Sequence, residues 1–336
     1  MSVGPDRTDV LVVGAGIAGL AAALAADREG ADVTVATKAE RPEEASTWWA
    51  QGGIAVTRDD PEQFKQDILD ASAGTADEAA VDVLVEEADA AVRDVLVDEV
   101  GIEFDAADGD FDYGQEAAHD EPRILHVDAA TGKHVHVPLL NYVADETGVT
   151  ILEDTAALEL IRHEGRVYGA MLERDGEWDP TFAGATVLAT GGIGALYPVS
   201  TNPPDATGDG IAMAALAGAE VADMEFVQFH PTAYADEDPF LVSEAVRGEG
   251  AVLRNGDGER FMPDYHPDAE LAPRDVVARA VQAEREATGE VVLDVSPLDF
   301  AGHFPDLAAK CEERGVDLPH IPVAPAEHFL CGGVAV

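Results

Sequence analysis

Three glycines at a fixed spacing are the first residues of this sequence that could do chemistry. Residues 14–19 read GAGIAG. In this pattern the first glycine permits a tight turn, the second lets the backbone approach a pyrophosphate, and the third lets a helix pack on a strand. A β-branched run at residues 9–13 precedes the motif, and an Ala/Leu-rich stretch to about Glu29 follows it. This context predicts a dinucleotide site at a helix N-terminus; the alternative is a glycine-rich turn that binds nothing.

The glycine motif by itself does not distinguish NAD from FAD. A second strand is expected at residues 32–37, and it ends in Thr37 and Lys38 rather than in the acidic residue that usually binds a ribose. Residues 45–55 read ASTWWAQGGIA, which is small and polar and then rich in glycine. The backbone and hydroxyl groups of such a segment can contact a flavin and its phosphates.

The composition excludes several classes of protein. The 336 residues include 20 Lys+Arg and 67 Asp+Glu, for a net charge of −47, and only four of the basic residues are lysines. A surface this acidic repels phosphate backbones and anionic lipid. We therefore expect neither nucleic acid nor a membrane as a partner. The acids alternate with apolar residues, which predicts a folded protein of halophilic type from a salt-rich cytoplasm.

Neither cysteines nor histidines predict a metal site. Cys311 and Cys331 are too few for a disulfide framework or a four-cysteine site. The histidines of residues 119–136 show no repeated ligand spacing. The N-terminus lacks the basic and apolar regions of a signal peptide, so we expect a cytoplasmic protein.

The remaining sequence predicts further strands and helices that position these residues. Residues 75–78 read as a capping box in front of an amphipathic helix with an acidic face. Residues 149–192 read as four strands, and a helix is expected at residues 208–219. From Gln228 onward we expect Pro- and Gly-punctuated polar loops with one helix at about residues 273–288, and a domain boundary near residues 226–234.

Motifs along essentially the whole chain resemble the fumarate reductase/succinate dehydrogenase flavoprotein family. In order, they are GAGIAGL, STWWAQGGIA, VLATGGIG, TGDGIAMA, EFVQFHPTA, SEAVRGEGA, RFMP, ELAPRDVVARA and HFLCGGV. The resemblance implies an α/β fold with an α+β insert. It implies a Rossmann-like FAD-binding domain at residues 1–228 and a smaller capping domain at residues 229–336.

Residues 115–119 and 123–132 resemble the members of this family that oxidise L-aspartate to iminoaspartate, the first step of de novo NAD biosynthesis. Oxygen or fumarate is then the electron acceptor, and quinolinate synthase is a candidate partner. Ser46 stands where membrane-bound relatives carry a histidine bonded to the flavin, which implies non-covalent FAD. Two alternatives stay open: a soluble fumarate reductase-like flavoprotein for another C4 dicarboxylate, and an inactive remnant.

The resemblance also implies which residues bind FAD. They are Gly14, Ala15, Gly16, Ile17, Ala18 and Gly19 in the phosphate turn; Lys38; Ser46, Thr47, Trp48, Trp49, Ala50, Gln51, Gly52 and Gly53 along the flavin; Ala156 or Ala157; and Asp209. Lys38 could instead be a surface lysine. An acid such as Asp209 is also favoured at a helix N-terminus by the dipole, and both explanations can hold.

The catalytic residues implied by the resemblance are Arg274, Glu244 and Arg247. Arg274 matches the group that delivers a proton opposite the hydride in fumarate reduction; in aspartate oxidation it would act in reverse or only orient the substrate. A free guanidinium has a pKa far above neutral pH and keeps its proton, so it needs neighbours such as Glu244 and Arg247 that relay the proton. The alternative is an ordinary ion pair between Arg274 and Asp275 in the first turn of a helix.

Five further residues match substrate contacts of the family: Glu116, Gln228, His230, Ser243 and His328. The two histidines match residues that hold carboxylates, and Gln228 and Ser243 would add neutral hydrogen bonds. Glu116 matches the acid that meets the substrate amino group; the alternative is one solvated loop acid among many. The histidines could instead be core residues satisfied by the backbone.

The sequence ends in CGGVAV, within a family motif. Full-length members continue with an arginine that clamps the second carboxylate and a Ser-Asn-Ser stretch against the flavin. We expect these features to lie outside the 336 residues, and a chain that supplies them is a second candidate partner.

Overall fold

The computed structural model describes Val3 and residues 6–107, 109–115, 119–128, 130–235 and 239–335. The chain forms two compact units. Unit 1 comprises Met1–Gly192, Pro203–Ala222 and Val334–Val336, whereas unit 2 comprises Ile193–Asn202 and Asp223–Gly333. Short segments from distant parts of the sequence therefore complete each unit.

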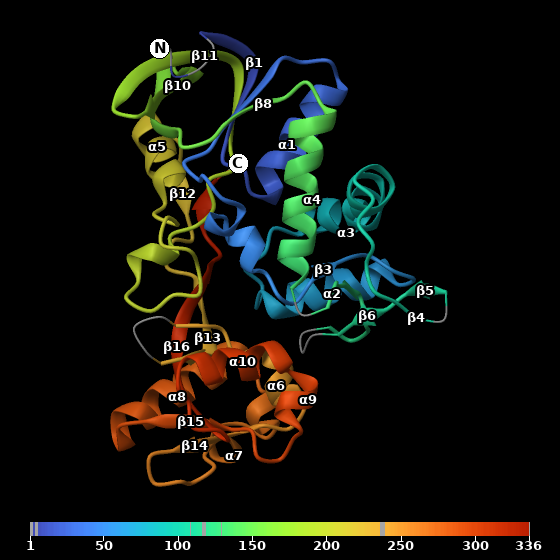
Figure 1. The fold of residues 1–336 in the computed structure, drawn as a ribbon, viewed down its shortest axis with the longest axis vertical. Coiled ribbons are helices and arrows are strands. Elements are labelled where there is room, and N and C mark those ends of the chain that lie inside the picture. The colour runs from blue at the N-terminus through green and yellow to red at the C-terminus, as the bar shows by residue number, and fades with distance from the viewer. Residues whose placement is uncertain are drawn as a thin grey trace. The chain divides into compact units, whose positions relative to one another are not determined.

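Unit 1 is built on a six-stranded sheet in the order β8-β2-β1-β11-β10-β9 (Figure 1). Strands β8, β2, β1 and β11 are parallel, and β10 and β9 extend the sheet as antiparallel neighbours. The bounds are β1 (Arg7–Val13), β2 (Val33–Ala36), β8 (Thr150–Leu152), β9 (Ala156–His163), β10 (Arg166–Arg174) and β11 (Glu177–Leu188). The predicted α/β class with a Rossmann-like domain is confirmed. The strand order reverses direction beside β1, which is where doubly wound sheets bind ligands.

Both faces of this sheet are covered, as the apolar runs of its strands require. Val12 of β1 packs with helices α1 (Ile17–Arg28) and α4 (Thr131–Glu146) on one face. Leu11 and Val13 point to the other face, where they share a cluster with Met213 of helix α5 (Asp209–Ala217). Alternate residues of one buried strand thus hold the two layers together.

A smaller part of unit 1 carries helices α2 (Pro61–Ala71) and α3 (Glu78–Val92), a π-helical turn η3 (Arg93–Glu99) and short strands. These strands are β3 (Ile54–Ala55), β4 (Ala106–Ala107), β5 (Asp110–Phe111), β6 (Tyr113–Gly114) and β7 (Ile124–Leu125). A further strand of unit 1, β12 (Val221–Ala222), follows α5 along the chain. The capping box expected at residues 75–78 is wrong. Asp77 is the N-cap of α3 and accepts from the Ala79 N–H at 2.9 Å, whereas the Thr75 hydroxyl donates to Ser72 O.

Unit 2 contains a four-stranded sheet in the order β13-β16-β15-β14 (Figure 1). Its antiparallel strands are β13 (Val227–Tyr234), β14 (Val252–Asn255), β15 (Val291–Asp294) and β16 (His320–Leu330). The expected polar loops after Gln228 are therefore wrong. Pro231 in β13 and two prolines in β16 led to the prediction of loops, because proline is rare in the interior of a strand.

Helix α8 (Arg274–Thr288) of unit 2 agrees with the predicted helix at residues 273–288. Its buried face packs Val277 and Val281 against sheet residues such as Leu253 and Leu293. The other helical elements are α6 (Glu244–Gly248), α7 (Met262–Tyr265), α9 (Phe300–His303), α10 (Pro305–Glu313) and the 3-10 turns η4 (Gly194–Leu196) and η5 (Ala269–Leu271). Unit 2 thus has its own core, on which polar residues can be held rigidly.

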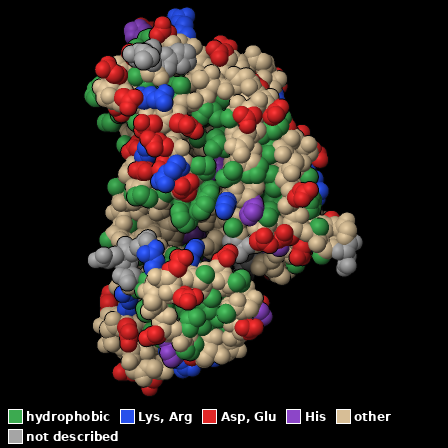
Figure 2. Space-filling view, viewed as in Figure 1, with side chains coloured by type: hydrophobic (Ala, Val, Ile, Leu, Met, Phe, Trp, Pro, Cys, Tyr) green, Lys and Arg blue, Asp and Glu red, His purple; other side chains and the backbone are tan. Residues whose placement is uncertain are grey.

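Acidic side chains spread over the visible face of each unit (Figure 2). In the part of the chain that the structure describes, no helix has the length and apolar character needed to cross a membrane. The same described residues contain no group of three or more His, Cys, Asp or Glu side chains that could hold a metal ion.

Candidate functional site

The glycine motif forms the turn between β1 and α1. Gly14 has a φ of +108°, and a Cβ there would lie 2.2 Å from Ala189 O. A Cβ at Gly19 would lie 1.9 Å from Gly14 O. Glycine is therefore required at both positions, the first by its backbone conformation and the second by close packing. Gly16 is the N-cap of α1 and has no side-chain cap, so this helix begins with its backbone N–H groups in reach of an anion.

The segment after β2 folds against this turn. Residues 46–49 form the 3-10 turn η2 (Ser46–Trp49), and Thr47 Oγ1 accepts from the Ile17 N–H at 3.1 Å. A Cβ at Gly132, in the first turn of α4, would lie 2.0 Å from Thr47 O. The start of α4 therefore packs directly against the backbone of this segment. The Gly132 N–H donates to Ala50 O at 2.8 Å. The structure thus brings the predicted cofactor segments 14–19 and 46–53 together.

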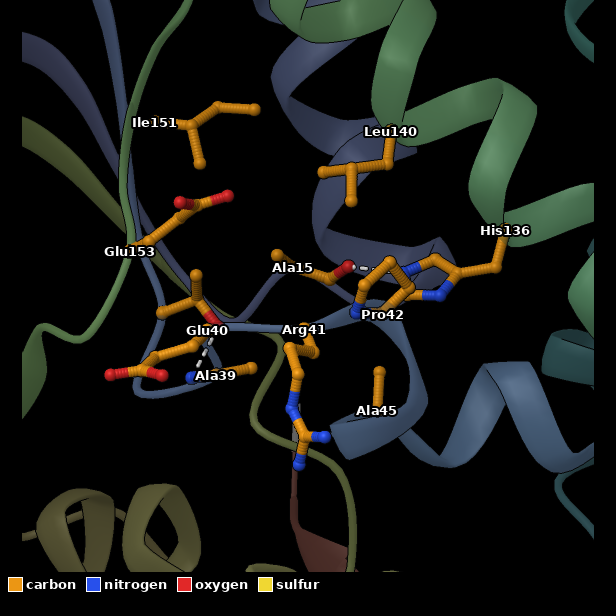
Figure 3. A pocket seen from close by; sticks show the side chains of 11 residues that line it. Ala15, Ala39, Glu40, Arg41, Pro42, Ala45, His136, Leu140, Ile151 and Glu153 are labelled. Carbon is orange, nitrogen blue, oxygen red and sulfur yellow. Dashed lines mark hydrogen bonds between the residues drawn. The ribbon is translucent and has the colours of Figure 1, made fainter.

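A pocket opens at the C-terminal ends of β1 and β2 (Figure 3). It is lined by Ala15, Thr37, Ala39, Glu40, Arg41, Pro42, Ala45, His136, Leu140, Ile151 and Glu153. His136 is almost fully buried, and its Nε2 lies 2.7 Å from Ala15 O, as the dashed line in Figure 3 shows. Burial lowers the pKa of His136, so the ring is neutral and its Nε2–H donates to Ala15. Its buried Nδ1 has no hydrogen-bond partner within the described chain.

Lys38 and Asp209, two predicted cofactor residues, form one ion pair. Lys38 follows β2 and Asp209 begins α5, and Lys38 Nζ lies 2.6 Å from Asp209 Oδ2 and 3.0 Å from Thr207 Oγ1. Burial raises the pKa of Asp209, but hydrogen bonds from Lys38 and Thr207 outweigh burial and lower it. Lys38 is 41% exposed in its side chain, so it remains accessible to a ligand. Ala156 begins β9, where it pairs with Glu173 of β10.

The residues present fit a dinucleotide such as FAD. The N-cap Gly16 gives the helix start no side-chain cap, although Thr47 binds the Ile17 N–H. A pocket adjoins this turn, and the buried His136 has an unpaired ring nitrogen in the pocket wall. The pocket holds both signs of charge at its rim through Glu40 and Arg41, which suits ribose hydroxyls and phosphate oxygens.

A second group of predicted residues meets in unit 2 around Arg274. This residue begins α8, with Pro273 as the N-cap. Its Nε donates to Glu244 Oε2 at 2.6 Å, and its Nη1 donates to Gln228 Oε1 at 3.1 Å. The expected alternative, an ion pair with Asp275, is wrong because Asp275 pairs with Arg279 at 2.6 Å. A cation at a helix N-terminus opposes the helix dipole, so Arg274 is placed here at some cost to stability.

Arg247 shares the carboxylate oxygen that Arg274 uses. Its Nη2 lies 3.6 Å from Glu244 Oε2, and its Nη1 donates to Glu270 O in a short hydrogen bond. The Arg247 side chain is fully buried, and its Nε and Nη2 make no hydrogen bond with any described residue. Burial is the largest influence on the Arg247 guanidinium and lowers its pKa, which eases loss of a proton.

The two predicted histidines lie beside this cluster on neighbouring strands. His230 of β13 and His328 of β16 have ring centroids 5.4 Å apart. The pKa of His230 is held well below its usual value by burial, and then by the charges of Arg274, His328 and Arg247. Burial and the charge of Arg274 lower the pKa of His328 to about 4. Both rings are therefore neutral near pH 7.

Ser243 and Glu116 complete the predicted set. Ser243 is the N-cap of α6, where its Oγ accepts from the Ala245 N–H at 3.3 Å. Its own hydroxyl hydrogen remains available as a donor. Glu116 lies outside the described residues.

The sequence analysis missed several polar residues behind the site. Glu270 is buried, and its carboxylate accepts from Arg260 Nε at 3.0 Å and from Arg260 Nη2 at 2.6 Å. Its backbone carbonyl accepts from Arg247 Nη1. Glu327 is buried beside His328, where Ser200 and Asn202 bind it. The run Ser200-Thr201-Asn202, three hydrogen-bonding side chains in a row, was the one available signal in the sequence.

A family model described as "FAD binding domain" matches residues 9–336. The chain therefore belongs to the family of FAD binding domains, and FAD is its cofactor.

Two curated relatives are named L-aspartate oxidases. That of Halobacterium salinarum is 68% identical over 98% of this chain and 66% of its own length. L-aspartate oxidase 1 of Ralstonia nicotianae is 44% identical over 97% of this chain and 65% of its own length. The chain thus spans slightly less than two thirds of the length of these relatives.

Solved structures show the same fold. An E. coli quinol fumarate reductase superposes with a TM-score of 0.90 at 27% identity, covering 98% of this chain and 61% of that one. Sdh1 of Mycobacterium smegmatis superposes with a TM-score of 0.84 at 32% identity, covering 98% and 60%. The arrangement described for each unit therefore has counterparts in these two solved structures.

Proposed function

We propose that this chain takes part in the FAD-dependent oxidation of L-aspartate to iminoaspartate. The observation that carries the proposal is the cluster in unit 2, where two guanidinium groups share one oxygen of Glu244 beside two neutral histidines. A dicarboxylate needs cationic forks and N–H donors, and these are concentrated here in a chain with a net charge of −47. The relatives named L-aspartate oxidases support aspartate as the dicarboxylate.

In the proposed reaction the chain binds and orients the substrate. FAD, when bound, supplies the acceptor for the two electrons that leave L-aspartate. Arg274 presents a guanidinium whose Nε and Nη1 are fixed by Glu244 and Gln228, so its outer edge can receive a carboxylate. His230 and His328 add neutral donors to carboxylate oxygens, and Ser243 adds a hydroxyl.

The same cluster provides a route for a proton. Glu244 Oε2 lies between Arg274 and Arg247, at 2.6 and 3.6 Å. The buried Arg247, whose pKa is lowered, is a better proton carrier than a solvated arginine. We assign Arg274 the contact with substrate, and Glu244 and Arg247 the relay behind it. Glu116 is assigned the substrate amino group.

We assign FAD binding to unit 1, which holds most of residues 1–228, and substrate capping to unit 2, which holds most of residues 229–336 together with residues 193–202 and 223–228. FAD is held non-covalently, with Ser46 at the position of the tethering histidine in membrane-bound relatives. The protein acts in a salt-rich cytoplasm, with oxygen or fumarate as electron acceptor. Its product enters de novo NAD biosynthesis, where quinolinate synthase is the proposed consumer.

The test is anaerobic addition of L-aspartate to the FAD-loaded protein, purified together with a chain that supplies the second carboxylate clamp and the flavin-facing stretch, followed by the visible absorbance of the flavin. We expect bleaching in the parent and in Arg279→Lys, a matched control on the same helix whose side chain is 71% exposed. Arg274→Lys keeps FAD but loses most of the bleaching rate, because lysine lacks the planar fork. Retained FAD without bleaching by L-aspartate contradicts the proposal.

The second candidate is a fumarate reductase-like flavoprotein for another C4 dicarboxylate. The structural likeness to quinol fumarate reductase supports it, because the unit 2 residues fit any dicarboxylate. Bleaching by succinate but not by L-aspartate favours this candidate.

A further inference from the structure

A short segment of unit 2 is fastened to strand β16 beside His328. The backbone of residues 199–201 pairs with Glu327, with Thr201 N–H donating to Glu327 O and Glu327 N–H donating to Val199 O, both at 2.9 Å. Ser200 Oγ donates to Glu327 Oε2 at 2.7 Å. Asn202 Nδ2 donates to the same carboxylate oxygen at 3.0 Å and to His328 O at 2.8 Å. The segment thus has little freedom to move along β16.

Close packing behind the segment adds to this restraint. A Cβ at Gly194 would lie 2.6 Å from Glu327 Oε2 and 2.7 Å from Ser200 Oγ. Glycine is therefore needed at this position for Ser200 to reach the buried carboxylate of Glu327. Glu327 is 1% exposed, so losing these partners would leave a buried carboxylate unsatisfied.

The consequence of this fastening is the position of Thr201. Its Oγ1 lies 2.7 Å from His328 Nδ1 and 3.3 Å from Glu327 O. A hydroxyl has one hydrogen, so it donates either to the histidine or to the carbonyl. The carbonyl already accepts the Thr201 N–H, and its distance from the hydroxyl is long, which favours donation to the histidine.

The neighbouring histidine offers a comparison. His230 Nδ1 accepts from the Thr232 N–H at 3.3 Å, and a backbone N–H can only donate. A neutral His230 therefore carries its hydrogen on Nε2. If Thr201 donates to His328, both rings carry hydrogen on Nε2, and each can donate to a carboxylate oxygen.

We propose that Thr201 is a positioning residue that donates its hydroxyl hydrogen to Nδ1 of His328 and so fixes the Nε2–H tautomer of that ring. The ring then presents a neutral N–H donor to a substrate carboxylate, an assignment that rests on the proposed dicarboxylate function. In the opposite tautomer, Nε2 is a lone-pair acceptor and repels a carboxylate. Ser200, Asn202 and Glu327 act by holding Thr201 in register with the histidine.

The tautomer can be measured directly by NMR of protein labelled with ¹⁵N in its histidine rings, because the two ring nitrogens shift in opposite directions in the two tautomers. The His328 signals are assigned by their loss in His328→Gln. We expect the Nε2–H tautomer in the parent and in Thr201→Ser. Thr201→Val removes the hydroxyl, so the ring should become a mixture of tautomers.

Succinate, titrated into the FAD-loaded protein and followed through the flavin spectrum, tests the link to substrate. Thr201→Val should weaken succinate binding by about tenfold or more, whereas Thr201→Ser should stay within about threefold of the parent. Thr232→Val is the matched control. It removes a buried hydroxyl that donates to Val242 O at 2.9 Å, but it leaves His328 untouched. A loss of affinity in this control equal to that in Thr201→Val would show a merely structural effect and overturn the proposal.

Two other outcomes also decide the question. An Nδ1–H tautomer in the parent, or an unchanged tautomer in Thr201→Val, overturns the role of Thr201. If Thr201→Val changes the tautomer but neither succinate nor L-aspartate binds to the parent, the proposed function fails while the control of the tautomer by Thr201 stands.

Discussion

Replacing Glu244 by glutamine should destabilise unit 2 because one carboxylate oxygen serves two guanidinium groups. Arg274 Nε lies 2.6 Å from Oε2, and Arg247 Nη2 lies 3.6 Å from the same atom. Glutamine keeps the shape and one oxygen acceptor, but it removes the charge. The buried Arg247 then keeps the favourable charge of Glu270 but loses that of Glu244, and Arg274 still repels it.

The size of the effect follows from the distances and the burial. A unit charge pair at about 4 Å is worth roughly 4 kcal/mol at an effective dielectric constant of about 20. Breaking a buried pair by removing one partner typically costs about 3–5 kcal/mol. Glu244 is 21% exposed in its side chain, and glutamine is easier to bury than a carboxylate, so both effects reduce the loss. We expect the free energy of unfolding to fall by about 2–3 kcal/mol.

Urea unfolding at constant KCl measures this change. Glu249→Gln is the matched control, because Glu249 directly follows α6 and its side chain is 54% exposed. Arg247→Met provides a double-mutant cycle: without the buried guanidinium, Glu244→Gln should cost at least about 1 kcal/mol less. A loss below about 0.5 kcal/mol in Glu244→Gln, or equal losses in both backgrounds, would refute the shared-carboxylate reasoning.

Three further predictions concern pH, the cofactor turn and salt. Because the pKa of His328 is about 4 in the folded protein and about 6.5 when unfolded, the unfolded chain binds the extra proton between these values. The contribution of His328 to the free energy of unfolding is therefore full above about pH 6.5 and falls by about 3 kcal/mol toward pH 4. In urea unfolding, His328→Gln should flatten the dependence of this free energy on pH. The same dependence in the variant as in the parent would contradict the prediction. His136→Leu removes the ring N–H that donates to Ala15 O, so it should weaken FAD binding by about tenfold or more in a fluorescence titration. His136→Gln should lose less affinity for FAD. Equal FAD affinities in the parent and in His136→Leu would count against a role for this hydrogen bond. Raising KCl from about 0.1 M to about 1 M should raise the midpoint temperature of thermal unfolding. The reason is that the Debye length falls from about 10 Å to about 3 Å around a chain of net charge −47. The same midpoint at both KCl concentrations would contradict a destabilising charge repulsion.

The sequence predicts the nucleotide side of the protein well, because its signals are local. The turn at residues 14–19 lies between a strand and a helix. Gly14 has a positive φ, and a Cβ at Gly19 would meet Gly14 O, so both of these requirements for glycine arise within the turn. Helix α8 is equally local, since its apolar spacing of 3.6 residues is visible over four turns. Such features can be recognised without knowing what they pack against.

The sheet of unit 2 could not be predicted in this way. Strands β13 and β16 pair although about ninety residues separate them, and prolines interrupt both. The cluster around Glu244 depends on that sheet and on helices α6 and α8, so no spacing in the sequence shows that two arginines share one oxygen. The resemblance supplied these residues as a set, and the structure supplied their geometry. Thr201 and Glu327 had neither a motif nor a spacing to mark them.

The pairing of β13 with β16 has a consequence for how this protein can vary in length. The register places Gln228 opposite Phe329 and His230 opposite Ala326, with irregularities between Gln228 and Phe229 and between His230 and Ala233. Side chains alternate between the faces of a strand, so one inserted or deleted residue would turn every later side chain to the opposite face. Single substitutions could exchange a hydrogen-bonding group here, but a one-residue insertion or deletion would separate both histidines from Arg274. Natural variation in length should therefore gather in exposed turns such as residues 256–258, and homologous genes should keep a constant number of codons across these two strands.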